Sequence, residues 1–288
     1  MISRKNFWKK ENNINVLFET DYLFSTLINS NFINSLQNIA LKIINKSLNK
    51  SFNDLDESLK FINQTTSIKL LKEKDLYTQL DCELYKVIKY FNFDKSIKGI
   101  EFPANLRVAH GIAPGSYMDR QYATDYFHSD IWSDEPEDMI NVIIYLAGDL
   151  DATKMEIYDF NDDIAEDILN YRGDYKLAPF SRDKFKKIDY KPLIGQAIFW
   201  DGIVPHNTFR KDGLARISID FRIRRIDPYL NIDDRWTRDY IPRSRYWYLN
   251  TKMNNEFEKR LTEEIKNISI LHSNKVVQKR LNCSTKDF

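Results

Sequence analysis

The stretch Tyr126-Phe127-His128-Ser129-Asp130-Ile131-Trp132 decides how the rest of the chain is interpreted, because it carries a His-x-Asp pair. In a β-strand alternate side chains share one face, so this stretch, taken as a strand, points His128 and Asp130 together and Ser129 away. A second histidine, His206, follows far downstream. Two imidazoles and one carboxylate form a donor set that suits Fe(II) and leaves coordination positions open.

The segment from Arg216 to Ile223 alternates between polar and apolar residues, which predicts a strand with one face in a cavity. The polar face carries Arg216, Ser218, Asp220 and Arg222, and the apolar face carries Ile217, Ile219, Phe221 and Ile223. An arginine and a serine two residues apart can hold a carboxylate, the arginine through its fork of N–H groups and the serine through its hydroxyl. We therefore expect Arg216 and Ser218 to bind an acidic ligand.

Composition indicates a folded, reduced protein. The chain has 288 residues, 42% of them hydrophobic and 14% aromatic, which is enough for a substantial core. The formal net charge is only +1, which argues against a nucleic-acid partner. The two cysteines, Cys82 and Cys283, lie far apart. The first residues lack an apolar core and no apolar run reaches the length of a membrane span, so we expect neither a signal peptide nor a transmembrane helix. These features predict a cytoplasmic protein without a membrane partner.

The first part of the chain, residues 1–98, is predicted to be a helical layer packed on the core. After an entry segment, Thr20-Asp21 is expected to cap a helix. Apolar residues then recur at three- and four-residue steps in two long sets, with a weaker helical stretch around Leu55, Leu59 and Ile62 between them. The first set is Phe32, Ile33, Leu36, Ile39, Ala40, Ile43, Ile44 and Leu48, and the second is Leu76, Leu80, Leu84, Val87, Ile88 and Phe91.

Residues 99–226 are predicted to form the β-rich core, interrupted by an insertion at about 149–193 that is either a lid or surface decoration. The stretch Ile140–Leu146 is expected to point Ile140, Val142, Ile144 and Leu146 one way and Asn141, Ile143 and Tyr145 the other. Met155 to Phe160 is a further candidate strand, and Asp162 to Tyr171 a short helix. Residues 227–288 form an aromatic and basic segment with a final helix over Asn255 to Ile268. We treat residues 1–288 as one domain.

The order His128-x-Asp130, His206, Arg216-x-Ser218 resembles the Fe(II)/2-oxoglutarate-dependent dioxygenase superfamily. The segment Gly195–Asp201 with Pro205-His206-Asn207 is similar to the corresponding part of phytanoyl-CoA hydroxylase-like members, whose relatives include oxygenases of bacterial carbohydrate and natural-product clusters. The resemblance covers roughly residues 100 to 225. It implies a mainly β fold with α-helices: a double-stranded β-helix (jelly roll, cupin-like) core, with the helical N-terminal layer and the C-terminal helix around it.

The resemblance also implies the roles of these residues. His128, Asp130 and His206 would bind Fe(II), Arg216 would pair with the distal carboxylate of 2-oxoglutarate, and Ser218 would support it. With O2, such an enzyme oxidises a C–H bond of its substrate and releases succinate and CO2. Halogenating relatives lack the carboxylate ligand, so the presence of Asp130 favours hydroxylation or another oxidation.

Several further residues are candidates for contacts with small molecules. Asn141 and Tyr145 share a strand face and are expected either to contact 2-oxoglutarate or to hydrogen-bond within the core. The candidates for substrate contact are Arg107, His110, Arg222, Arg235 and Arg238. Arginines beside aromatic residues suit an anionic or sugar-like metabolite, but a C-terminal segment that forms a homodimer contact has the same composition.

Two other functions remain open. A cupin-like metal-dependent isomerase or epimerase would use the same three ligands, although it would not need Arg216 and Ser218. A non-catalytic interaction protein could keep a jelly roll without binding iron. Dependence on 2-oxoglutarate distinguishes the first alternative from the dioxygenase, and metal binding distinguishes the second.

Overall fold

The computed structural model describes residues 14–65, 68–110, 123–133, 135, 138–211, 213–225 and 246–249. The helices are α1 (Ser30–Leu48), α2 (Leu55–Ile62), α3 (Lys74–Tyr90) and α4 (Ala165–Asn170). The strands are β1 (Val16–Glu19), β2 (Leu23–Leu27), β3 (Ile97–Phe102), β4 (Asn105–Ala109), β5 (Met139–Gly148), β6 (Thr153–Asp159), β7 (Lys186–Lys187), β8 (Gln196–Asp201), β9 (His206–Arg210), β10 (Arg216–Arg225) and β11 (Tyr246–Leu249). Short 3₁₀ helices cover Phe93–Lys95, Asp130–Ser133, Asp162–Ile164, Tyr175–Leu177 and Arg182–Lys184.

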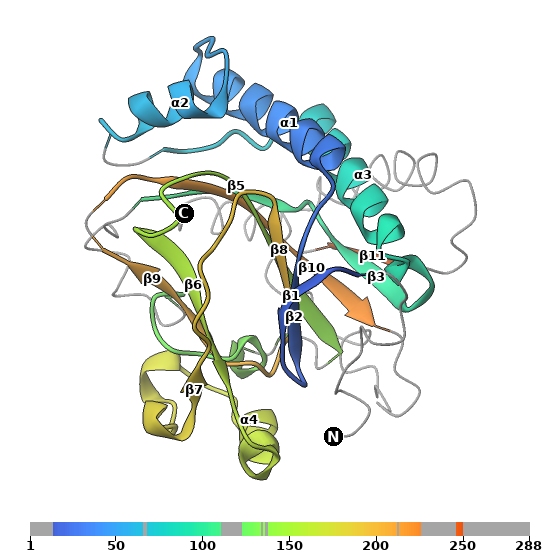
Figure 1. The fold of residues 1–288 in the computed structure, drawn as a ribbon, viewed down its shortest axis with the longest axis vertical. Helices are drawn as coiled ribbons and strands as arrows, with labels where there is room; N and C mark the ends of the chain where they lie inside the picture. Colours follow the sequence, from blue (N-terminus) through green and yellow to red (C-terminus); the bar gives the residue numbers. More distant parts are fainter. Residues whose placement is uncertain are drawn as a thin grey trace, which may run out of the picture.

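Two antiparallel sheets form the β part of the described chain (Figure 1). In the larger sheet the strand order is β1-β2-β8-β5-β10-β3-β11, and β4 pairs with β10 beside β3. The smaller sheet has the order β7-β6-β9. The fold is therefore mainly β with helices and is consistent with a jelly-roll-like core, as the sequence predicts, while the double-stranded β-helix itself stays a prediction.

Helices α1, α2 and α3 cover one face of the larger sheet (Figure 1). The apolar residues that the helical periodicity singles out are buried on α1 and α3, with Phe32, Leu48 and Leu76 partly buried. They pack in one cluster with Ile140, Val142, Ile144 and Leu146 of β5, while Ile143 and Tyr145 of β5 pack in a second cluster. The predicted alternation along β5 is thus confirmed. Each fully buried aliphatic side chain contributes about 1.5–3 kcal/mol.

The N-terminal layer differs from the prediction at its beginning. Thr20-Asp21 caps no helix, because the flanking residues form the hairpin β1–β2, which pairs with β8. Helix α1 begins later, where the side chain of Asn29 accepts a hydrogen bond from the backbone N–H of Asn31 at 2.9 Å. The helical layer predicted over residues 1–98 therefore also contains the hairpin β1–β2, which is part of the larger sheet.

The predicted insertion at 149–193 also needs a correction. Strand β6 lies inside that range and pairs with β9, so it belongs to the smaller sheet. The short helix expected near Asp162 is present as a 3₁₀ turn followed by α4. The rest of the predicted insertion lies between β6 and β8. It contains α4 and β7, and β7 pairs with β6 at the edge of the smaller sheet (Figure 1).

Strand β10 lies inside the larger sheet, because it pairs with β5 on one side and with β3 and β4 on the other. It carries several of the candidate site residues. A bulge between Ile217 and Ser218 shifts its register on β5, so that Ser218 lies opposite Tyr145. Close to this bulge, Gly148 has φ +102°, and a Cβ there would lie 2.3 Å from the carbonyl oxygen of Ala215. Only glycine fits this approach of β5 to the start of β10.

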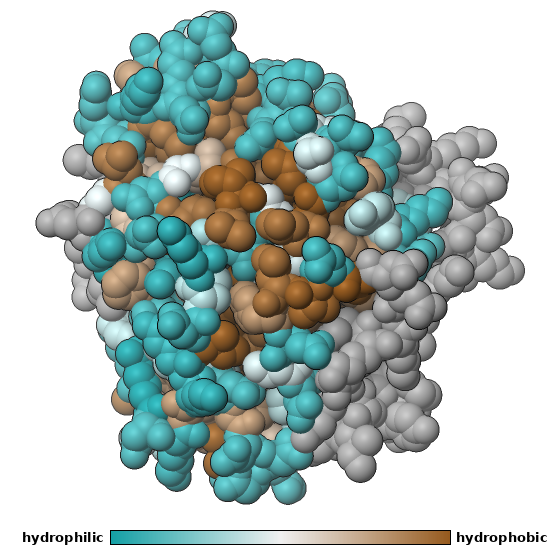
Figure 2. All heavy atoms as spheres, in the orientation of Figure 1, coloured by the Kyte–Doolittle hydropathy of each residue, from teal (hydrophilic) through white to brown (hydrophobic). Residues whose placement is uncertain are grey.

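Hydrophobic side chains gather near the middle of the face in Figure 2, over the region where Figure 1 places β1 and β2. On these strands Val16, Leu17 and Leu27 are exposed. Separately, no helix in the described part of the chain has the length and apolar character needed to span a bilayer.

Candidate metal centre

The backbones of the two candidate histidine ligands pair directly with each other. The N–H of His128 donates to the carbonyl oxygen of His206 at 3.0 Å, and the N–H of His206 donates to that of His128 at 2.8 Å. His206 begins β9, and His128 lies outside the named strands. This antiparallel bridge places the two imidazole rings 4.3 Å apart, centroid to centroid.

Asp130 also lies at this centre, but its backbone conformation differs from the predicted strand. The prediction that His128 and Asp130 lie on one strand was wrong, because the chain turns after His128 and Asp130 begins the 3₁₀ helix Asp130–Ser133. Ser129 points away from the centre, as expected, and its hydroxyl donates to the carbonyl oxygen of Gly202 at 2.7 Å. The turn nevertheless directs the Asp130 carboxylate toward both histidines.

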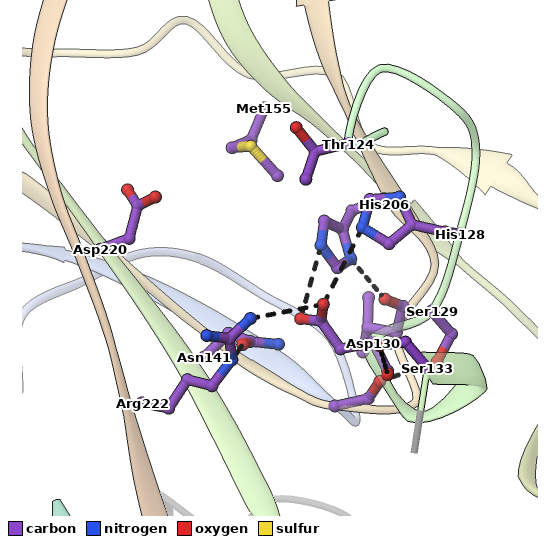
Figure 3. Close-up of polar contacts among 12 residues, drawn as sticks. Thr124, His128, Ser129, Asp130, Ser133, Asn141, Met155, His206, Asp220 and Arg222 are labelled. Atoms are coloured by element: carbon purple, nitrogen blue, oxygen red, sulfur yellow. Dashed lines mark hydrogen bonds and ion pairs between the residues drawn. The ribbon is translucent and has the colours of Figure 1, made fainter. Parts of the chain in front are cut away.

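The three side chains form a compact, buried cluster (Figure 3). Nε2 of His128 lies 3.9 Å from Oδ1 of Asp130, and Nε2 of His206 lies 3.7 Å from Oδ2. One ligand atom from each residue lies within 4.8 Å of the others. This spacing is longer than a hydrogen bond and leaves room for an ion between the three donors.

The tautomers of both rings suit metal binding. Nδ1 of His128 is 2.7 Å from the carbonyl oxygen of Tyr126, and Nδ1 of His206 is 3.0 Å from that of Val204. A carbonyl oxygen can only accept, so each Nδ1 carries the proton and each Nε2 presents its lone pair toward Asp130. In accordance, Nε2 of His128 is buried without a hydrogen-bond partner among the described residues.

Burial keeps both imidazoles neutral. Burial, together with the neighbouring His206 ring, lowers the pKa of His128 to about 3. Burial also lowers the pKa of His206, although Asp130 acts in the opposite direction. At neutral pH the two rings are therefore neutral, with Nε2 unprotonated, and do not need to lose a proton before they bind a cation.

Arg216 is buried on the inner side of β10 without a counter-ion among the described residues. It is 1% exposed, its Nη1 donates to the carbonyl oxygen of Thr153 at 3.1 Å, and its Nε has no partner. Its guanidinium lies 5.4 Å from the centre of the Tyr145 ring. Burial lowers the pKa of Arg216, yet an arginine stays protonated in proteins, so this position retains a buried positive charge.

Further unpartnered polar atoms accompany this charge. The hydroxyls of Ser218 and Thr153 are buried without hydrogen-bond partners among the described residues. Thr153 begins β6, and its carbonyl oxygen accepts the hydrogen bond from Arg216. Buried polar groups are normally paired, so a cationic guanidinium with two unpaired hydroxyls indicates a site for a ligand that carries a carboxylate.

Tyr145 and Asn141 play different parts. The Tyr145 hydroxyl lies 3.1 Å from the hydroxyl of Tyr190, which donates to the carbonyl oxygen of Met155 at 2.5 Å. Tyr145 is thus part of the surroundings of Arg216. Asn141 lies near Asp130 instead (Figure 3), where its Oδ1 accepts a hydrogen bond from Nε of Arg222 at 3.0 Å.

The structure places three of the candidate substrate residues. Arg222 lies at the metal cluster, with Nη2 3.5 Å from Oδ1 of Asp130. Arg107 forms an ion pair with Asp220. His110 is half-buried at the end of β4, and burial lowers its pKa.

Two other candidates, Arg235 and Arg238, lie outside the described residues, as does the predicted helix over residues 255–268. Within the same C-terminal run, Tyr246–Leu249 form β11, which pairs with β3 at the edge of the larger sheet.

Two residues of the insertion contact the site, and no pattern in the sequence points to either. Tyr175 stacks on His128 with 4.2 Å between ring centroids and 18° between planes, and its hydroxyl donates to that of Ser133 at 3.1 Å. Tyr190 lies beside Tyr145, as described above. Both belong to an aromatic-rich stretch in which no periodic pattern separates site residues from packing residues.

The residues fit the two groups that the sequence resemblance implies. The buried, unpartnered Nε2 of His128 faces a second imidazole and a carboxylate, which is a donor set for Fe(II). The buried guanidinium of Arg216, with the free hydroxyl of Ser218, fits the distal carboxylate of a 2-oxo diacid.

No protein-family model and no curated protein match this chain. Among solved structures, the chain is similar to a prolyl-4-hydroxylase from Pseudomonas putida, with TM-score 0.38, 14% identity, and coverage of 71% of this chain and 88% of that chain. It is also similar to an N-substituted L-amino acid dioxygenase from Burkholderia ambifaria AMMD, with TM-score 0.37, 11% identity and coverage of 70% and 82%. The same dioxygenase in complex with alpha-KG matches with TM-score 0.34, 10% identity and the same coverage. The site itself, and not these coarse likenesses, supports the function proposed below.

Proposed function

We propose that this protein is an Fe(II)- and 2-oxoglutarate-dependent dioxygenase of the phytanoyl-CoA hydroxylase-like type, with a double-stranded β-helix core. It would hydroxylate, or otherwise oxidise, a C–H bond of a small metabolite and release succinate and CO2. One observation carries the proposal. Two neutral imidazoles and a carboxylate lie close enough together to share one metal ion, and Arg216 is buried without a counter-ion among the described residues.

His128, Asp130 and His206 would hold Fe(II) through Nε2, a carboxylate oxygen and Nε2. When bound, Fe(II) supplies the activation of O2 that removes an unactivated hydrogen atom from the substrate. The chain contributes the rest of the arrangement. The carbonyl oxygens of Tyr126 and Val204 fix the orientation of the two rings, and the ring of Tyr175 covers one side of His128.

Arg216 and Ser218 would hold the distal carboxylate of 2-oxoglutarate and thereby orient its other end. Such a carboxylate would give the buried guanidinium the counter-ion that the described residues do not supply, and would accept a hydrogen bond from the Ser218 hydroxyl. Tyr145 and Tyr190 would line the same end of the pocket. Asn141, for which contact with 2-oxoglutarate was one expectation, is better placed to hold Arg222.

The substrate is proposed to be small and sugar-like. The described arginines near the centre other than Arg216 already have carboxylate partners: Arg107 pairs with Asp220, Arg210 with Asp125, and Arg222 with Glu101 and Asp130. An anionic substrate would therefore depend on residues such as Arg235 and Arg238 of the C-terminal run. A homodimer through that run remains a proposal of the same kind.

A turnover assay tests this function. The full-length protein is incubated with Fe(II), ascorbate, O2 and 2-oxoglutarate, with and without pools of sugars, sugar phosphates and nucleotide sugars, and succinate is measured. We expect succinate that depends on Fe(II) and rises with one substrate pool, and no succinate from Asp130→Ala. Undiminished succinate from Asp130→Ala contradicts the assignment. Metal-dependent conversion of a substrate without 2-oxoglutarate would favour the isomerase or epimerase.

A further inference from the structure

Asp220 and Asn141 each have one polar atom in a contact and one buried polar atom without a partner among the described residues. Oδ2 of Asp220 forms an ion pair with Nε of Arg107, whereas its Oδ1 is buried and unpartnered. Oδ1 of Asn141 accepts a hydrogen bond from Nε of Arg222 at 3.0 Å, whereas its Nδ2 is buried and unpartnered. Buried polar atoms are normally paired, so these two atoms indicate where a ligand binds.

Both residues belong to one wall beside the candidate metal centre. In the pairing of β10 with β5, Asn141 lies opposite Arg222, and Asp220 lies two residues before Arg222 on the same face of the strand. Asn141 and Asp220 are therefore diagonal neighbours, with backbones about 7–8 Å apart. Arg222 in turn contacts Asp130 (Figure 3). One small ligand next to the metal can thus contact both side chains.

The arginine partners of the two side chains fix which atom is free. A guanidinium donates and never accepts, so the oxygen of Asn141 must face Arg222, and its NH2 group is the free one. Asp220 likewise offers one oxygen to Arg107 and keeps the other as an acceptor. The wall therefore presents one N–H donor and one carboxylate acceptor.

A free donor beside a free acceptor selects the kind of group that binds. An ionised carboxylate only accepts and an ammonium group only donates, so each would leave one of the two atoms unpaired. This applies to 2-oxoglutarate as well, whose oxygens all accept. A hydroxyl group both donates and accepts. Because Arg107 already balances the charge of Asp220, a neutral donor is sufficient, and a neutral group with hydroxyls fits both atoms.

We propose that Asn141 and Asp220 are substrate-binding residues that hold hydroxyl groups of a sugar-like substrate beside the metal. Asn141 donates and Asp220 accepts, while Arg222 and Arg107 keep the two side chains in place. The inference rests on the proposed function and adds to it the residues that recognise the substrate. Loss of either hydrogen bond leaves a buried polar atom unpaired, which lowers affinity by about tenfold or more.

The test inverts the hydrogen-bonding character of each residue without changing its shape. In Asp220→Asn, the amide oxygen must face Arg107 and the NH2 group takes the place of the acceptor, so the wall has two donors. In Asn141→Asp, an oxygen replaces the NH2 group, so the wall has two acceptors. The double variant again has one donor and one acceptor, in exchanged positions and with the formal charge of the wild type.

Binding is measured on the full-length protein loaded with Zn(II) and 2-oxoglutarate, by saturation-transfer NMR. The probes are sugars, sugar phosphates and nucleotide sugars, with amino acids and aliphatic monocarboxylates that lack hydroxyls as the comparison set. We expect the wild type to bind at least one of the sugar probes and none of the comparison set. Each single variant should bind that probe about tenfold more weakly or more. The double variant should recover part of the loss.

A matched control separates recognition from the loss of a carboxylate near β10. Asp138 pairs with Arg224 of β10, with 3.0 Å between Oδ1 and Nε, and Asp138→Asn should bind the probe as the wild type does. The affinity of Asp220→Asn for 2-oxoglutarate, measured by calorimetry, should also be unchanged. Thermal unfolding checks that each variant folds. If Asp220→Asn does not fold, Asn141→Asp alone decides.

The outcomes distinguish this inference from the proposed function. A wild type that binds 2-oxoglutarate but none of the sugar probes overturns the inference and leaves the proposed function intact, as do folded single variants with unchanged affinity for the probe. Weaker 2-oxoglutarate binding in Asp220→Asn also overturns it, because the pair would then serve the cosubstrate. A double variant that binds more weakly than both single variants overturns the pairing of donor and acceptor. A wild type that binds neither Zn(II) nor 2-oxoglutarate contradicts the proposed function and the inference with it.

Discussion

His128 and His206 are each other's backbone partners, with N–H to carbonyl distances of 3.0 and 2.8 Å in the two directions. The two imidazoles therefore take their relative position from the pairing of the backbone and not from flexible side chains. A metal site built in this way should be largely preformed, and removing one ligand should change binding more than folding.

Asp130→Ala should lose metal affinity while the fold persists. The carboxylate faces the two imidazoles, and Glu101 still balances Arg222 in the variant. Changes to partners of metal ligands typically cost about 10–100-fold in affinity, so loss of a ligand itself should cost more than about 100-fold. Chelator competition gives the affinity and thermal unfolding the stability. His110→Ala serves as the control, and equal metal affinity in the two variants would contradict the site.

Arg216→Gln should weaken the binding of 2-oxoglutarate without weakening the binding of the metal. Truncation of one partner in a buried charge pair costs about 2–5 kcal/mol, which corresponds to about 30-fold or more in Kd. Isothermal titration of the metal-loaded protein measures this. Arg210→Gln is the matched control, because Arg210 already pairs with Asp125 at 3.0 Å. If the two variants lose the same affinity, the ligand carboxylate binds elsewhere.

Tyr175→Leu should loosen the metal site, and Tyr175→Phe should not. Both rings of the His128–Tyr175 stack are buried, and such a pair is worth about 0.5–1.5 kcal/mol beyond its buried area. Tyr175→Phe keeps the ring and loses the hydrogen bond to Ser133. Metal affinity about 2–10-fold lower in the leucine variant alone is expected from that energy. Equal behaviour of the two variants would place Tyr175 outside the site.

Glu156→Gln should remove a part of the stability that depends on pH. Burial raises the pKa of Glu156, but hydrogen bonds from Lys187, Asn207 and Tyr158 outweigh it and hold that pKa below the usual value. A lowered pKa contributes stability above the unfolded-state pKa, which is lost as pH falls through the folded-state pKa. The difference in melting temperature between wild type and Glu156→Gln should therefore be larger at pH 7 than near pH 3. A constant difference would contradict the lowered pKa.

Strong periodicity made parts of the fold predictable. Helices α1 and α3 and strands β5 and β10 repeat their apolar residues over many positions, so both the element and its buried face follow from the sequence. The hairpin β1–β2 was missed because its strands have only four and five residues, too few for a pattern to emerge.

Several features of the candidate site could not be predicted from the sequence. The His-x-Asp spacing was interpreted as strand alternation, but Asp130 lies in a 3₁₀ turn, and its carboxylate reaches the histidines by that turn. The link between Arg222 and Asp130 depends on how β10 and the 3₁₀ turn pack together, which no local pattern reports. Tyr175 and Tyr190 come from the insertion, whose aromatic residues serve both packing and the site.

The central claim is that one pocket holds Fe(II) and 2-oxoglutarate together. An anaerobic titration of the metal-free protein with Fe(II) and then 2-oxoglutarate, followed through the weak visible charge-transfer absorption of the chelate, tests this directly. Wild type should develop the band, and His206→Ala should not. A wild type that binds Fe(II) but develops no band with saturating 2-oxoglutarate would contradict the account.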